Sequence, residues 1–101
     1  MMHEPVLVGD IGGTNVRLAE AIRKDDGGLL LDDVRVLAGS EHDDFEAALE
    51  YYLHQRNHRV CRQALFAFAG PVFNNTIEMT NRNWVINGQR LAGKFGFEAV
   101  K

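Results

Sequence analysis

The stretch VLVGDIGGTNVRLAEA, residues 6–21, joins two apolar segments through an acid, two glycines, Thr14 and Asn15. It has neither the lysine and following helix of a Walker loop nor the G-x-G-x-x-G spacing of a dinucleotide-binding turn. Glycines let a backbone approach a ligand closely, and consecutive N–H groups can form an anion-binding nest. Asp10 suits a phosphate site when a hydrated Mg²⁺ lies between carboxylate and phosphate. The stretch predicts a phosphate-binding hairpin, and a plain hairpin with a polar turn is the competing interpretation.

The composition indicates one globular domain. The chain has 101 residues, of which 46% are hydrophobic and 25% charged, with a net charge of -3. Its Lys and Arg residues are scattered, so we expect no nucleic-acid partner and no membrane partner. Cys61 is the single cysteine, which excludes an internal disulfide. Because the sequence shows no secretion signal, we expect a cytoplasmic protein.

The first half of the chain predicts an antiparallel meander followed by a helix. Three strands are expected, over residues 6–8, 16–22 and 29–37, and the first is an unbroken apolar run, stopped by Gly9, that suggests burial on both faces. Ser40 and Asp43 form a capping pattern. Helical spacing then follows in five residues, Phe45, Ala48, Leu49, Tyr52 and Leu53.

The second half predicts a buried strand over residues 63–70 and a return strand over 76–80. Asn74 and Asn75 between them tolerate the left-handed backbone of a tight hairpin. A short helix is expected within residues 87–97, with Asn87 as its N-cap and Gly96 as its C-cap. A last strand is expected near residue 98.

Two motifs carry a resemblance to a known family. DIGGTNVR, residues 10–17, resembles the phosphate hairpin of the sugar kinase, heat-shock ATPase and actin superfamily, and GGTN-x-R is most similar to bacterial-type glucokinases. AFAGPVFNNTIEMTNRNWVI, residues 67–86, resembles the glucokinase segment that leads into MTNxxW. The resemblance covers essentially the whole chain. It implies an α/β, ribonuclease H-like (actin-like ATPase) lobe, in which a mixed sheet begins with an antiparallel three-stranded meander and helices pack on it.

The resemblance also implies site residues. Asp10 would hold Mg²⁺ through water. The terminal phosphates of ATP would contact four residues, Gly12, Gly13, Thr14 and Asn15. The sugar cleft would be formed by Thr80 and Asn81, with Gly70 and Pro71 shaping its wall. A turn role remains the alternative for Asn81, an ion pair with an acidic neighbour is the alternative for Arg17, and Trp84 is interpreted as packing.

The resemblance further implies that residues 1–101 are an incomplete N-terminal small lobe, without the large lobe and C-terminal helix. The intact protein would be a homodimeric glycolytic enzyme that uses ATP and Mg²⁺ to convert glucose to glucose 6-phosphate. No catalytic residue is expected in this chain, because the general-base Asp would follow just beyond Lys101. We therefore expect the chain to be inactive alone and to expose an apolar patch. A kinase for another hexose and a non-catalytic sugar-sensing protein built on the same lobe are the alternatives.

Overall fold

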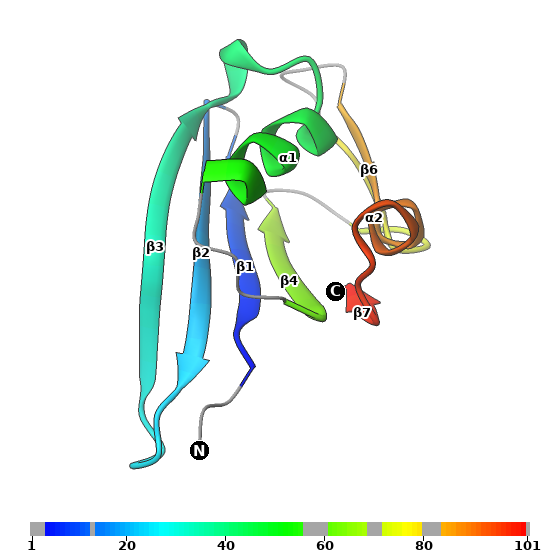
Figure 1. Cartoon of the computed structure of the whole chain (residues 1–101). Helices are drawn as coiled ribbons and strands as arrows, with labels where there is room; N and C mark the ends of the chain where they lie inside the picture. The colour runs from blue at the N-terminus through cyan, green and yellow to red at the C-terminus, as the bar shows by residue number, and fades with distance from the viewer. Residues whose placement is uncertain (1–3, 13, 56–60, 69–71, 80–83, 101) are drawn as a thin grey trace.

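The computed structural model describes residues 4–12, 14–55, 61–68, 72–79 and 84–100 (Figure 1). The elements follow in the order β1 (Val6–Ile11), β2 (Asn15–Arg23), β3 (Leu29–Ala38), the 3-10 turn η1 (Gly39–Glu41), α1 (Phe45–Gln55), β4 (Gln63–Phe68), β5 (Thr76–Glu78), β6 (Val85–Asn87), α2 (Gly88–Phe95) and β7 (Ala99–Val100).

Five strands form a mixed sheet in the order β3-β2-β1-β4-β7. The first three strands are an antiparallel meander, and β4 lies parallel to β1 while β7 lies parallel to β4. Since α1 precedes β4, the chain crosses over one face of the sheet to reach the far side of β1 (Figure 1). The predicted mixed sheet with an initial meander is confirmed.

Strands β1 and β4 are buried mainly on one face. Leu7, Ile11 and Phe66 point to the inner face and belong to the core under α1. The side chain of Leu65, on the outer face, is 54% exposed. The prediction that residues 6–8 are buried on both faces, and that residues 63–70 form a buried strand, is therefore wrong for the outer face, because apolar side chains also line that uncovered face. Nor does Gly9 stop the first strand, which continues to Ile11.

Helix α1 is anchored at both ends. The carboxylate of Asp44 accepts a hydrogen bond from the N–H of Ala47 at 2.7 Å, so Asp44 is the capping residue. The predicted Ser40 and Asp43 arrangement is wrong, since Ser40 lies in η1 and Asp44 directly precedes the first helical residue. At the other end, the guanidinium of Arg35 on β3 donates to the carbonyl of Gln55 at 3.0 Å.

Strand β3 carries a bulge beneath α1. Asp33 has a φ of 53°, and the pairing register with β2 shifts between Leu18 and Glu20. The hydroxyl of Tyr52 on α1 donates to the carbonyl of Asp33 at 2.9 Å. The helix therefore satisfies a backbone group that the bulge removes from the ladder.

The segment from β5 to α2 forms a second unit against α1. Asn74 and Asn75 adopt φ values of 52° and 56°, which confirms the predicted left-handed turn. However, β5 pairs with β6 and not with β4 as a returning hairpin strand, because Ile77 and Ile86 lie opposite each other and are both buried. Asn87 and Gly96 cap α2 as predicted: the Asn87 side chain accepts from the N–H of Arg90.

Neither helix has the length and apolarity needed to cross a membrane, within the part of the chain that the structure describes. The outer face of the sheet carries the expected exposed apolar side chains. The most exposed of these lie on β3 and β4 and are Leu29, Leu31, Val34, Val36 and Leu65.

Candidate functional site

The hairpin between β1 and β2 is a short turn held by backbone hydrogen bonds. Ile11 pairs with Val16, and the N–H of Gly12 donates to the carbonyl of Asn15 at 2.9 Å. The carbonyl of Thr14 accepts from the N–H of Gly39, also at 2.9 Å, which ties the turn to the end of β3. The turn is therefore fixed from two sides. Gly13 lies outside the described residues.

The polar side chains of this hairpin are available to a ligand. Asp10, Thr14 and Asn15 are all exposed. Among the residues that the structure describes, no hydrogen bond or ion pair engages these three side chains. A hydroxyl, an amide and a carboxylate therefore surround a backbone turn without being used by the fold itself, which is typical of a binding site.

The hairpin lies at the carboxyl ends of two parallel strands. Ile11 at the end of β1 is in register with Phe68 at the end of β4. In the sheet, β2 lies on one side of β1 and β4 lies on the other side. Open α/β sheets bind ligands at such an edge, outside the carboxyl ends of the strands. Topology and exposed polar groups thus point to the same place.

Phe45 joins the second unit to this edge. Its ring contacts those of Phe66 and Phe68 on β4 at centroid distances of 5.2 Å and 6.2 Å, and that of Trp84 at 6.4 Å. Trp84 is 3% exposed, so its predicted packing role is confirmed. Because Trp84 directly precedes β6, the start of this strand is held beside the end of β4.

Four predicted sugar-site residues, Gly70, Pro71, Thr80 and Asn81, lie outside the described residues. Their described neighbours Phe68 and Trp84 both contact Phe45, as above. The N–H of Met79 donates to the carbonyl of Trp84 at 2.9 Å, which extends the pairing of β5 with β6 by one hydrogen bond.

Asp10 is the acidic residue of this edge. The pairing of β1 with β2 places it directly opposite Arg17, and both point to the outer face of the sheet. Across the described residues, no three His, Cys, Asp or Glu side chains come close enough together to hold a metal ion. Mg²⁺ does not need such a cluster, because it keeps several waters and binds through one or two carboxylates and substrate phosphates. A single exposed aspartate next to a phosphate turn fits that requirement.

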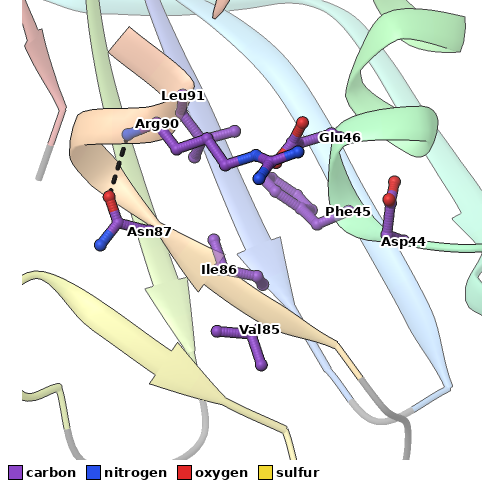
Figure 2. A pocket seen from close by; sticks show the side chains of 8 residues that line it. All are labelled: Asp44, Phe45, Glu46, Val85, Ile86, Asn87, Arg90 and Leu91. Carbon is purple, nitrogen blue, oxygen red and sulfur yellow. Dashed lines mark hydrogen bonds and ion pairs between the residues drawn. The ribbon is translucent and has the colours of Figure 1, made fainter. Parts of the chain in front are cut away.

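A separate hollow of about 300 Å³ lies between α1 and the β6–α2 unit (Figure 2). Asp44, Phe45 and Glu46 line one side of it, and the other side is formed by β6 and α2 residues, Val85, Ile86, Asn87, Arg90 and Leu91. The sequence analysis predicted neither this hollow nor the contacts of Phe45. The only local signal was the acidic residue at the start of an expected helix, which is common for reasons of the helix dipole alone.

Tyr52 on α1 has a raised pKa. Burial, followed by the nearby charge of Asp33, raises the pKa of Tyr52 to about 12. Its hydroxyl therefore stays protonated and continues to donate to the Asp33 carbonyl. This tyrosine stabilises the fold.

The comparisons with known proteins agree with the geometry. A family model described as Glucokinase matches residues 7–101. The chain is 33% identical over 98 residues to a glucokinase of Saccharophagus degradans, a match covering 97% of this chain and 30% of that relative. It is 39% identical over 97 residues to a glucokinase of Stenotrophomonas maltophilia, covering 96% of this chain and 29% of that relative. The chain therefore spans about 30% of the length of these curated relatives.

A solved structure is similar over the same range. The crystal structure of glucokinase from an Antarctic psychrotroph matches with a TM-score of 0.89 at 26% identity. The match covers 97% of this chain and 31% of that chain. The mixed sheet with its covering helices is thus an actin-like ATPase fold.

Proposed function

Because the chain belongs to the glucokinase family, we propose that it forms the phosphate-binding lobe of an ATP-dependent kinase that phosphorylates the 6-hydroxyl of glucose. The observation that carries this proposal is the β1–β2 hairpin. Its exposed Asp10, Thr14 and Asn15 lie at the carboxyl ends of two parallel strands and are not used by the fold. The terminal phosphates of a nucleotide match the chemistry of this exposed polar hairpin.

The hairpin residues have separate roles in this proposal. The side chains of Thr14 and Asn15 donate hydrogen bonds to phosphate oxygens, and the absence of side chains at Gly12 and Gly13 lets the phosphates approach the backbone. Asp10 binds Mg²⁺ through water. The bound ion supplies neutralisation of the charge on the transferring phosphoryl group.

The sugar side is assigned to the segment around β5 and β6. Thr80 and Asn81 contact glucose, and Gly70 and Pro71 shape the wall of the cleft. An amide both donates and accepts hydrogen bonds, which suits neighbouring sugar hydroxyls. The general base is an aspartate that follows position 101, so none of the 101 residues takes the proton from the 6-hydroxyl. A kinase for another hexose uses the same lobe and remains the second candidate, because the sequence around β5 and β6 does not distinguish one hexose from another.

The contribution of this lobe to the reaction is positioning and electrostatics. Phosphoryl transfer requires the attacking and leaving oxygens to be in line, and few covalent steps fall to the protein. The hairpin is suited to hold the phosphates because backbone hydrogen bonds from both Gly12 and Gly39 fix the turn. Groups fixed before the reaction stabilise developing charge without reorganisation. We also propose that the intact enzyme is a cytoplasmic, glycolytic homodimer.

The test is a chimera in which residues 7–101 replace the matched segment of the Saccharophagus degradans glucokinase. We expect ATP-dependent phosphorylation of glucose, measured by a coupled assay, and none from the 101-residue chain alone. Asp10→Asn should lower kcat about 100-fold or more, the order seen when one charge-stabilising group is lost. Asp43→Asn is the matched control, since Asp43 is exposed and precedes α1.

Two outcomes would count against this assignment. An active chimera with an unchanged kcat in Asp10→Asn would remove the proposed role of the hairpin carboxylate. A folded chimera that binds ATP but phosphorylates no sugar would show that the nucleotide side is right and the sugar side is wrong. Mannose and fructose tested beside glucose decide between the two hexose candidates.

A further inference from the structure

One carboxylate joins α1 to α2. Glu46, in the first turn of α1, forms ion pairs with Arg90 and with Lys94 of α2, and each of its oxygens serves one cation. The Lys94 Nζ lies 3.4 Å from Oε1, and the Arg90 Nε is paired with Oε2. The two cations lie one helical turn apart, so together they restrain both the position and the rotation of α2.

The contact between α1 and the β6–α2 unit combines apolar packing with a hollow at the surface. The hollow of about 300 Å³ separates the first turn of α1 from β6 and α2 (Figure 2). Beside it, the described apolar contact between the two units comes from core residues, among them Phe45, Ile86 and Leu91. In Figure 2 the side chains of Glu46 and Arg90 approach each other across the hollow. The ion pair therefore lies at this hollow, beside the buried apolar contact, and adds a second restraint to it.

The contact between α1 and α2 connects the two sides of the proposed site. Helix α1 lies on the sheet whose edge carries the phosphate hairpin, and α2 continues directly from β6. β6 pairs with β5, and residues 80–83 lie between these two strands in the sequence. A rotation of α2 about α1 would move this hairpin relative to β1 and β4. The distance between the phosphate side and the sugar side thus depends on how firmly α2 is held.

We propose that Glu46 is a positioning residue that holds the β5–β6–α2 unit against α1 and so sets the sugar side of the cleft against the phosphate hairpin. The inference rests on the proposed function for its kinetic consequence, whereas the restraint itself concerns only described residues. The side chain of Glu46 is 13% exposed, against 52% for Glu50. The cations are more exposed, at 73% for Arg90 and 44% for Lys94, so the restraint comes from one partly buried carboxylate shared by two cations rather than from a buried pair.

The kinetic experiment compares Glu46→Gln with Glu50→Gln in the chimera described above. Glu50 is a matched control because it lies one turn further along α1 and pairs with Lys94 at 3.9 Å, but in water. We expect Glu46→Gln to raise the glucose KM about fivefold, equivalent to ~1 kcal/mol, with kcat and the ATP KM changed less than about twofold. Glu50→Gln should change none of the three constants.

Rescue separates positioning from a general loss of stability. Exchanging the charges in Glu46→Arg with Arg90→Glu should restore most of the glucose KM, while Glu46→Arg alone should raise it further. If Glu46→Gln proves unstable, Arg90→Gln with Lys94→Gln removes the same contacts from exposed positions on α2. That double variant should reproduce the selective rise in glucose KM.

A structural readout uses the 101-residue chain and needs no activity. Glu46→Gln should shift the backbone amide resonances of β6 and α2 in an ¹⁵N-correlated NMR spectrum, and those of β1 and β2 should stay in place. An inactive wild-type chimera would refute the proposed function without affecting this measurement. An active chimera in which Glu46→Gln and Glu50→Gln behave alike, or a spectrum with shifts confined to the neighbours of Glu46 on α1, would overturn the positioning role.

Discussion

The two faces of the five-stranded sheet are built from similar residues but have different surroundings. The inner face carries Leu7, Ile11 and Phe66, which pack beneath α1 and are almost completely buried. The outer face carries Leu65, Val34 and Val36, each more than half exposed. Apolar composition alone therefore does not identify the core, because it is the covering helix that turns one face into the interior.

The two faces also differ in where their charged side chains lie. Asp10 and Arg17 are charged and lie on the outer face, next to the exposed apolar residues. The inner face of the described core includes one fully buried charged residue, Glu20. We expect that changes on the inner face act through folding, whereas changes at the hairpin edge act through the proposed binding. Four predictions test this contrast.

The sharpest test uses two adjacent residues of β4 that point to opposite faces. Phe66→Ala removes a buried ring that meets Phe45 edge-on, and we expect it to lower the free energy of unfolding by about 3–5 kcal/mol. Leu65→Ala should lower it by less than about 1 kcal/mol, because the side chain is 54% exposed. Urea unfolding followed by circular dichroism gives both values. Equal losses would mean that the outer face is also buried in solution.

A smaller effect is expected from two glycines with different surroundings. A Cβ at Gly9 would lie 2.8 Å from Phe66 Cδ1 and 2.9 Å from Leu18 Cδ2, so Gly9→Ala should cost about 1–3 kcal/mol. Gly93, within α2, has nothing within 4 Å of its added Cβ. Gly93→Ala should therefore stabilise the chain by up to about 1 kcal/mol, since alanine favours helix. Opposite signs in thermal unfolding would confirm the contrast, and a harmless Gly9→Ala would contradict the close packing of β1 on β4.

Tyr52→Phe removes the hydrogen bond between α1 and the β3 bulge, and should cost about 1 kcal/mol at neutral pH. The variant should also lose a pH dependence of the free energy of unfolding that the wild type has. Because the folded pKa of about 12 lies above the ordinary tyrosine pKa of 10.0, the neutral hydroxyl contributes stability that is complete below pH 10 and is lost as the pH rises towards 12. Urea midpoints measured from neutral pH into this range should fall more steeply for the wild type. Parallel curves would mean that Tyr52 is not shielded by burial.

The smallest effect is expected on the outer face of β3. Val36→Thr keeps the β-branched shape at a position that is 56% exposed and opposite Arg17. The free energy of unfolding should change by no more than about 0.5 kcal/mol. A loss of more than that amount, measured at low protein concentration, would show that Val36 is buried in a way that the single chain does not reveal.

Local signals predicted much of the fold. The meander, the period of α1, the left-handed Asn74 and Asn75, and both caps of α2 depend on neighbouring residues, and all were predicted correctly. The partner of β5 was not, because strand pairing is decided by which apolar faces meet in three dimensions. The cap of α1 was placed at Ser40 and is Asp44, because Ser40 is used in the turn η1 and only the folded chain shows which polar residue precedes the helix.

The candidate site divides in the same way. The hairpin could be predicted because its glycines, acid and polar residues are contiguous. Phe45 and Glu46 could not, because their partners Trp84, Arg90 and Lys94 lie far along the chain. The assigned roles of Asp10, Thr14 and Asn15, and of the sugar-side residues, stay predictions.

The parallel pairing of β1 with β4 has a consequence for how the chain folds. The meander joins segments that are neighbours in sequence, whereas Val6 meets Gln63 only after β2, β3 and α1 have been traversed. Contacts between distant segments form more slowly than local ones. We therefore expect the meander to assemble early during synthesis, with β1 waiting as an unpaired edge until β4 emerges. That interval is when the chain is most exposed to aggregation.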